Sequence, residues 1–135
     1  MNLLVDTSVW SLAFRRDRPD QGPHVERLSS AIDGDTVVTT GLILQELLQG
    51  FLGAAARDQI VERFAALPLL VPDRRDHIDA ADLRTRCRRS GVQVGTIDAL
   101  IASLAIRYDL TILSTDADFT HMAPIARLKL WAPAE

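Results

Sequence analysis

Apolar residues along the chain form short runs that suit buried strands, and these runs alternate with longer segments of helical spacing. Strands are expected over residues 2–6, 36–39, 69–71, 110–114 and 127–131, where Leu, Val, Ile and Thr predominate. Helices are expected over residues 22–33, 41–51, 54–67, 76–90 and 97–108. This alternation predicts an α/β fold, with a single domain over residues 1–135 and a mostly parallel sheet of about five strands flanked by helices.

Residues that cap or break helices set the expected limits of these segments. Thr40 and Thr96 carry hydroxyls that can cap the helices that follow them, while Gly34 and Pro68 end helices. The helix over 76–90 is amphipathic, and its apolar residues are expected to face the core: Ile78, Ala81, Leu83 and Cys87.

Four acidic residues lie inside or at the end of apolar segments: Asp6, Glu46, Asp98 and Asp116. A buried carboxylate without a partner is costly or must take up a proton, so these four need a common explanation. Asp6 and Asp116 follow the first and fourth expected strands, and ligands of parallel α/β sheets bind beyond the carboxyl ends of strands. The simplest explanation is a divalent cation, such as Mg²⁺, shared by carboxylates at one rim of the sheet.

The helical neighbours of Glu46 are the strongest reason to place its side chain inside the fold. Leu42 and Ile43 precede Glu46 by one turn and Gly50 follows it by one turn, so the glutamate shares an apolar face. An ordinary capping role is a reasonable alternative for Asp98, near a helix start, and for Asp116, in a turn.

Further polar residues flank the four carboxylates. Asp118 follows Asp116 by two positions and is an additional acidic candidate. The hydroxyls of Thr7, Ser8 and Thr115 are expected to orient carboxylates or water, although turn chemistry explains them equally well.

The charge balance gives a weaker indication of a partner. The net charge is −3, which does not suggest a nucleic-acid binder. Yet fourteen of the fifteen basic residues are arginine, a residue suited to phosphate, and Arg15, Arg16 and Arg18 are candidate contacts for a phosphate-bearing ligand. The arginines over 84–89 fit a solvated helix face about as well as a binding role.

Features that the sequence lacks indicate the cellular compartment and argue against several other kinds of site. No segment has the length of a membrane span, and residues 1–15 do not resemble a signal peptide, so a cytoplasmic protein is expected. The single cysteine, Cys87, excludes an internal disulfide and suits packing on a helix. The three histidines have no metal-type spacing, and no Gly-rich phosphate loop or nucleophile elbow is found.

Four segments, in order, resemble the PIN-domain ribonucleases of the VapC toxin type. The segments span residues 4–10, 45–50, 96–102 and 113–119 and contain, respectively, Asp6, Glu46, Asp98, and Asp116 with Asp118. The resemblance implies a Rossmann-like sheet and an endoribonuclease dependent on Mg²⁺ or Mn²⁺. It implies that Asp6, Glu46, Asp98 and Asp116 are the acidic site residues, with Asp6, Asp98 and Asp116 holding metal. It further implies a homodimer neutralised by a cognate VapB-type antitoxin.

Two other interpretations stay open at this level. A phospho-receiver signalling domain shares the size and the alternating pattern, with Lys129 as its lysine and Asp73 as the nearest acceptor. Against it, Asp6 stands alone where a receiver carries an acidic pair. A related PIN nuclease of RNA maturation would use the same residues and differ only in its substrate. The identity of the RNA, the number of metal ions and the antitoxin are not defined by the sequence.

Overall fold

The computed structural model describes residues 2–15 and 22–134, and within these ranges the strands form one parallel sheet. The strands are β1 (Leu3–Val5), β2 (Val37–Thr40), β3 (Leu69–Leu70), β4 (Thr111–Leu113) and β5 (Lys129–Leu130). Their order is β3-β2-β1-β4-β5, and every neighbouring pair is parallel. The expected α/β class and five-stranded sheet are therefore confirmed, and the chain reverses direction of winding at β1, in the middle of the sheet.

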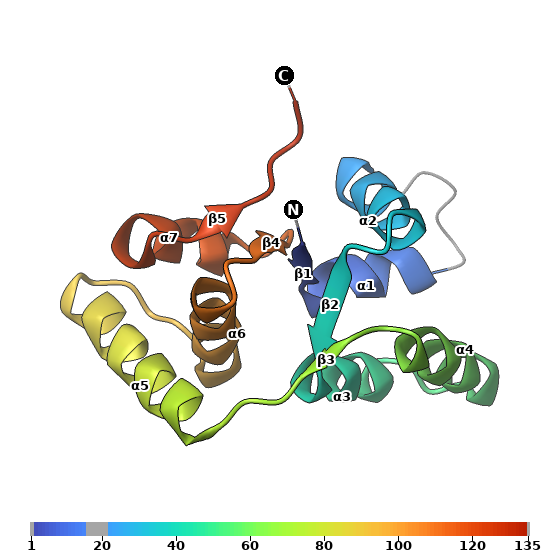
Figure 1. Ribbon diagram of the computed structural model, residues 1–135, viewed down its shortest axis with the longest axis horizontal. Coiled ribbons are helices and arrows are strands. Elements are labelled where there is room, and N and C mark those ends of the chain that lie inside the picture. Colours follow the sequence, from blue (N-terminus) through green and yellow to red (C-terminus); the bar gives the residue numbers. More distant parts are fainter. Residues whose placement is uncertain (1, 16–21, 135) are drawn as a thin grey trace.

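Helices flank the sheet in two groups (Figure 1). They are α1 (Thr7–Phe14), α2 (Pro23–Asp33), α3 (Gly41–Gln49), α4 (Ala54–Ala65), α5 (Arg74–Arg89), α6 (Thr96–Arg107) and α7 (Ala117–Ala126). The first four pack on one another on the right in Figure 1, and α5, α6 and α7 form a second group on the left. The central strands lie between the two groups, as in other parallel sheets whose faces are both covered.

Two of these helices, α1 and α7, were not expected from the sequence. Each begins directly after a strand and is capped by a carboxylate: Asp6 caps α1, and Asp116 caps α7. The β-branched and aromatic residues of α1 are weak helix formers, and Pro124 lies inside α7. Pro124 is close to the end of its helix, so it costs only one hydrogen bond there. The capping carboxylates were the signal that could have located both helices.

The sequence-based expectation was also wrong about the buried face of α5 and about the N-cap of α6. In α5, Ile78 is 46% exposed and Ala81 is exposed. The buried stripe is instead Asp76, Ala80, Leu83 and Cys87. A capping box between Asp73 and Asp76 fixes this register, because the Asp76 carboxylate turns inward and accepts from the Asp73 amide at 2.8 Å.

The start of α6 differs as well. Gly95, not Thr96, is the N-cap, and no side chain caps this helix. Thr40 does cap α3 as expected, accepting from the Ile43 amide at 3.4 Å. The start of α6 thus keeps its backbone amides free of a side-chain cap, at the point where Asp98 enters the first turn.

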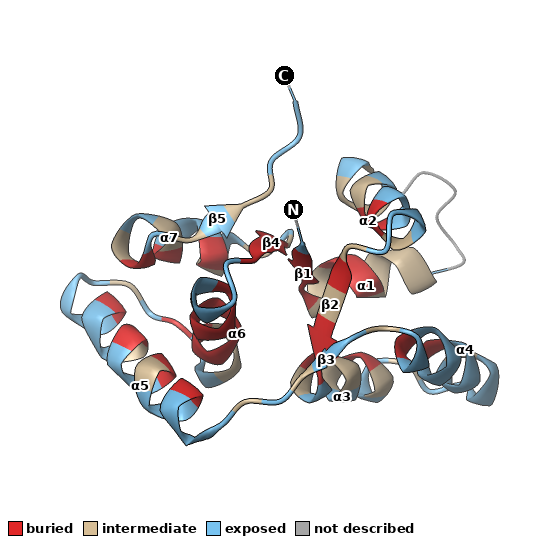
Figure 2. Cartoon of the chain, viewed as in Figure 1, coloured by how far each residue is buried: buried red, intermediate tan, exposed pale blue. Residues whose placement is uncertain are grey.

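The core lies along β1, β4 and α6 (Figure 2). Residues 3–5, 99–105 and 110–113 are all buried, and Cys87 packs among them, as expected for a structural thiol. Across the described ranges, every helix is too short or too polar to cross a membrane. A rim of polar residues follows the buried strands, and the candidate site lies on that rim.

Candidate metal centre

Asp6 is nearly inaccessible and is held by two serines. Its side chain is at the end of β1, and the residue is 5% exposed. Oδ2 accepts hydrogen bonds from the hydroxyls of Ser8 and Ser114, each at 2.8 Å, and from the Ser8 amide at 3.4 Å. A buried carboxylate is tolerated when several donors satisfy it, and these donors come from both sides of the β1–β4 pair.

The same serines connect Asp6 to the loop after β4. The Ser8 hydroxyl accepts from the Thr115 amide at 3.1 Å, and the Ser114 hydroxyl accepts from the Asp116 amide at 2.9 Å. The two hydroxyls are 3.3 Å apart. This network fixes the segment that carries Asp116 relative to Asp6, so two distant parts of the sequence are held in one arrangement.

Glu46 faces the same rim from α3. The hydroxyl of Thr7 donates to Glu46 Oε1 at 3.1 Å. Glu46 lies one turn after the buried Ile43, and Leu47 beside it is fully buried. The position of Glu46 at the edge of the core agrees with its apolar helical neighbours.

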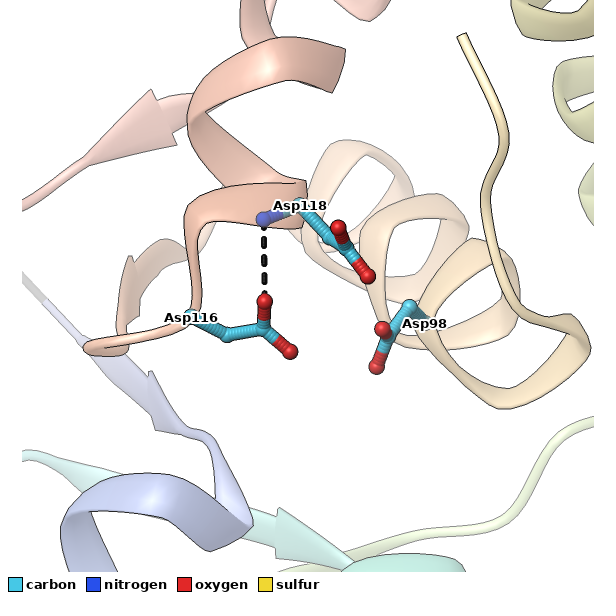
Figure 3. A group of neighbouring side chains, drawn as sticks. All are labelled: Asp98, Asp116 and Asp118. Atoms are coloured by element: carbon cyan, nitrogen blue, oxygen red, sulfur yellow. Dashed lines mark hydrogen bonds between the residues drawn. The ribbon is translucent and has the colours of Figure 1, made fainter.

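Asp98, Asp116 and Asp118 form a compact group of carboxylates (Figure 3). One oxygen from each lies within 4.8 Å of the others, and all three side chains are partly buried. Asp98 enters from the first turn of α6, while Asp116 and Asp118 come from the start of α7. The Asp118 amide donates to Asp116 Oδ1 at 2.9 Å, which orients the Asp116 carboxylate. Three hard oxygen donors at this spacing can hold a divalent cation.

Burial and the charges of the other four carboxylates all raise the pKa of Asp98. The pKa of Asp98 is raised to about 7, chiefly because burial removes water from the carboxylate. The charges of Asp6, Asp116, Asp118 and Glu46 raise it further, in that order. Carboxylates arranged at such a cost to one another are typical of a functional site, and a bound cation would reverse the repulsion.

The structure thus brings together all the acidic candidates, with one change of emphasis. Asp118, expected only as an additional position, is part of the compact group, whereas Asp6 and Glu46 lie beside that group. Thr7 and Ser8 contact carboxylates through their hydroxyls, while Thr115 contributes its backbone amide. Ser114 was not among the expected supports. Its place directly after an apolar strand, among other rim residues, was the only signal.

The candidate RNA contacts are only partly visible. Arg15 is exposed and closes α1. Arg16 and Arg18 lie outside the described residues.

The two residues that a phospho-receiver would need, Lys129 and Asp73, form other contacts. Lys129 pairs with Asp109, which precedes β4 and is therefore at the opposite end of the sheet from the carboxylates. Asp73 caps α5 and pairs with Arg107 at 3.2 Å. Neither residue is placed to act as a receiver requires.

Comparison with known proteins agrees with this geometry. The sequence profile of the PIN domain matches residues 3–124. A VapC ribonuclease from Mycobacterium bovis is 35% identical over 129 residues, a match that covers 94% of this chain and 96% of the relative. Ribonuclease VapC11 from Mycobacterium tuberculosis matches with the same identity and coverage.

Solved structures share the fold at lower sequence identity. VapBC2 from Rickettsia felis, bound to a DNA fragment from its promoter, has a TM-score of 0.76 at 21% identity, with 97% of this chain and 98% of that chain covered. The sarcin-ricin loop cleaving toxin VapC20 from Mycobacterium tuberculosis has a TM-score of 0.73 at 17% identity, with 88% and 93% covered.

Proposed function

The chain belongs to the PIN-domain family, among the VapC-type ribonucleases, and we propose that it hydrolyses phosphodiester bonds of cellular RNA with Mg²⁺ or Mn²⁺. The observation that carries the proposal is the group formed by Asp98, Asp116 and Asp118, whose oxygens lie within 4.8 Å of one another. Asp6 and Glu46 stand beside this group and share its field. The acidic set is complete, so we propose an active nuclease.

The proposed roles follow from the contacts of each carboxylate. Asp98, Asp116 and Asp118 would hold the cation. Asp6 would join them, since its hydrogen bonds to Ser8 and Ser114 all use Oδ2 and leave Oδ1 for a ligand. A bound divalent cation supplies an activated water and stabilises the charge on the departing oxygen. Glu46, steadied by Thr7, is a further ligand or orients that water.

The direct test is cleavage of total cellular RNA by the purified protein. We expect cleavage with Mg²⁺ or Mn²⁺, none with chelator, and none with Asp98→Asn, which keeps the side-chain shape. Asp82→Asn changes an exposed carboxylate of α5 and serves as the matched control. Sequencing the new RNA ends would define the target. Cleavage by Asp98→Asn at the wild-type rate, or cleavage unaffected by chelator, would overturn the proposed site.

We also propose that a VapB-type antitoxin, encoded beside this protein, binds and inhibits it. An apolar groove of about 320 Å³ between α1, α2 and α4 supports this, because it suits the apolar face of an amphipathic helix. Trp10, Phe14 and Leu28 line it. Leu52, between α3 and α4, is a further exposed apolar residue.

A substitution inside this groove tests the antitoxin proposal. Ala13→Arg adds a charged, bulky side chain to the groove while leaving the aromatic residues in place. We expect it to prevent co-purification with the product of the neighbouring gene without loss of RNA cleavage. Ala65→Arg, exposed on α4 away from the groove, is the control. Unchanged complex formation by Ala13→Arg would exclude this groove.

We further propose that the protein is a single-domain homodimer acting in the cytoplasm, where its RNA substrate and antitoxin are made. Light scattering of the purified chain tests the oligomeric state, and a monomer at all concentrations would contradict it.

A further inference from the structure

A second cavity adjoins the carboxylate group on the other side of the loop after β4. Its volume is about 330 Å³, within the range of pockets that hold small ligands. Ser114, Thr115 and Asp116 form one wall, and Trp131 and His24 contribute aromatic rings. Asp116 therefore belongs to both the carboxylate group and this cavity, so anything bound in the cavity lies next to the proposed cleavage site.

We infer that this cavity binds an unpaired nucleobase of the RNA, adjacent to the phosphodiester that is cleaved, by stacking it on Trp131. The inference rests on the proposed nuclease function and adds a binding subsite to it. The occupant is a base because the cavity offers an aromatic surface and polar edge contacts together, and these are the two features by which proteins bind splayed-out bases.

Trp131 is held in position rather than loosely exposed. Its backbone amide donates to the Ile112 carbonyl at 2.9 Å, which anchors it to β4 just past the end of β5. The His24 ring contacts the indole edge-to-face, with centroids 5.0 Å apart and an interplanar angle of 79°. The indole remains partly accessible. A stacking surface whose orientation is fixed in advance loses little entropy when a base binds.

The polar groups of the cavity indicate how the base edge would be contacted. Thr115 and Thr120 are exposed and carry hydroxyls that both donate and accept hydrogen bonds. The Ser114 hydroxyl is already committed to Asp6 and Asp116. Burial lowers the pKa of His24, so its ring stays largely uncharged near neutral pH. Adaptable hydroxyls tolerate any of the four bases, so this subsite favours single-stranded RNA more than a particular base.

The test uses the different environments of the two tryptophans. Trp10 is 1% exposed, so quenching of fluorescence by added RNA reports on Trp131. Quenching by a short single-stranded RNA oligonucleotide is measured in chelator, where no cleavage is expected. Because variants without Trp131 lack the reporter, the affinity of every variant is measured by the fluorescence anisotropy of the same oligonucleotide carrying a label. We expect saturable quenching of the wild type, no quenching with a duplex of the same sequence, and binding weakened about tenfold by Trp131→Ala. Trp131→Phe, which keeps an aromatic ring, should bind nearly as tightly as the wild type.

A filling variant covers the case in which Trp131→Ala does not fold. Thr120→Phe places a ring in the cavity from an exposed position of α7 and leaves Trp131 intact, and it should weaken RNA binding similarly. Tyr108→Ala removes an exposed aromatic ring distant from the cavity and is the matched control.

The two proposals fail in different ways. If the wild type cleaves RNA and both Trp131→Ala and Thr120→Phe bind and cleave as well as it does, the base subsite is wrong and the nuclease stands. If the folded wild type neither cleaves RNA nor shows quenching with it, both proposals are wrong. Saturable quenching that depends on Trp131, without cleavage, would support the subsite and overturn the nuclease.

Discussion

Ser114 donates a hydrogen bond to Asp6 Oδ2 at 2.8 Å, joining the ends of β4 and β1 across 108 positions of sequence. The same hydroxyl accepts from the Asp116 amide, so one serine positions two carboxylates. Groups of this kind orient metal ligands without touching the metal.

Ser114→Ala is expected to reduce RNA cleavage about 10- to 100-fold, because Asp6 loses one of its two hydroxyl donors and the Asp116 amide loses its acceptor. The activity should be partly rescued by raising the concentration of Mn²⁺, since the carboxylates themselves remain. Cleavage rates are compared across a metal titration, with Ser30→Ala, exposed on α2, as the control. A wild-type metal dependence in Ser114→Ala would show that this hydroxyl positions nothing essential.

The raised pKa of Asp98, about 7, predicts a pH dependence of stability in the metal-free protein. Between the ordinary Asp pKa and about 7, folded Asp98 keeps a proton that the unfolded chain releases, so its contribution to stability is present at low pH and lost as pH rises through 7. Asp98→Asn does not titrate. The difference in unfolding free energy between the variant and the wild type should therefore increase from pH 5 to pH 8.

Urea unfolding in chelator at several pH values measures this difference. Using the difference removes the contribution of other groups, such as Asp73, whose pKa is lowered by hydrogen bonding to Asp76. A difference that stays constant between pH 5 and pH 8 would contradict the assigned pKa of Asp98. With Mg²⁺ present at high concentration the dependence should weaken, because a cation favours the ionised carboxylate.

Arg107 is expected to matter for stability rather than activity. It donates to the Asp76 carboxylate at 2.7 Å, and Asp76 is 1% exposed with Oδ1 lacking a hydrogen-bond partner among the described residues. Arg107→Met should lower the unfolding free energy, because a buried carboxylate loses its charged partner. Arg75→Met breaks the exposed pair with Asp79 and should cost less than about 0.5 kcal/mol. Equal costs in thermal unfolding would refute this ranking.

Arg15, Arg16 and Arg18 are expected to guide the RNA backbone to an acidic centre. Replacing Arg15, Arg16 and Arg18 with Glu should weaken RNA binding. The plot of the logarithm of the binding constant against the logarithm of salt concentration should also become less steep, by about 0.7 for each phosphate that is no longer neutralised. A triple reversal of three exposed arginines elsewhere, Arg57, Arg74 and Arg75, to Glu controls for net charge. An unchanged slope in the variant of Arg15, Arg16 and Arg18 would remove these residues from the binding surface.

That the carboxylates of the acidic site lie close together was predictable from the sequence, because a carboxylate in an apolar segment is informative wherever it occurs. Glu46 was identified by its helical neighbours, and Asp6 and Asp116 by their place after buried strands. The sequence could not show that Asp118, rather than Asp6, belongs to the compact carboxylate group. That outcome depends on where α7 begins and how its first turn faces α6. Ser114 was missed because a serine after a strand has many roles, and only the pairing of β1 with β4 gives it this one.

The sequence analysis misassigned helices where one residue could have either of two structural roles. Asp6 and Asp116 suggested metal chemistry. A cap or a turn was the alternative for Asp116, but no helix was predicted after either residue, so α1 and α7 were missed. In α5 the apolar residues Ile78 and Ala81 suggested one buried face, but the charged pair of Asp76 with Arg107 selected another. Local hydrophobicity could not reveal a buried ion partner that lies 31 positions away.

The placement of carboxylates at helix starts has a consequence for how the protein matures. Asp6 and Asp116 cap α1 and α7, and Asp98 and Asp118 lie in first turns, so the positive ends of three helix dipoles point toward the acidic cluster. This built-in positive potential offsets part of the mutual repulsion before any cation arrives. We therefore expect the chain to fold without metal, so that the acidic site is already assembled when a cation binds.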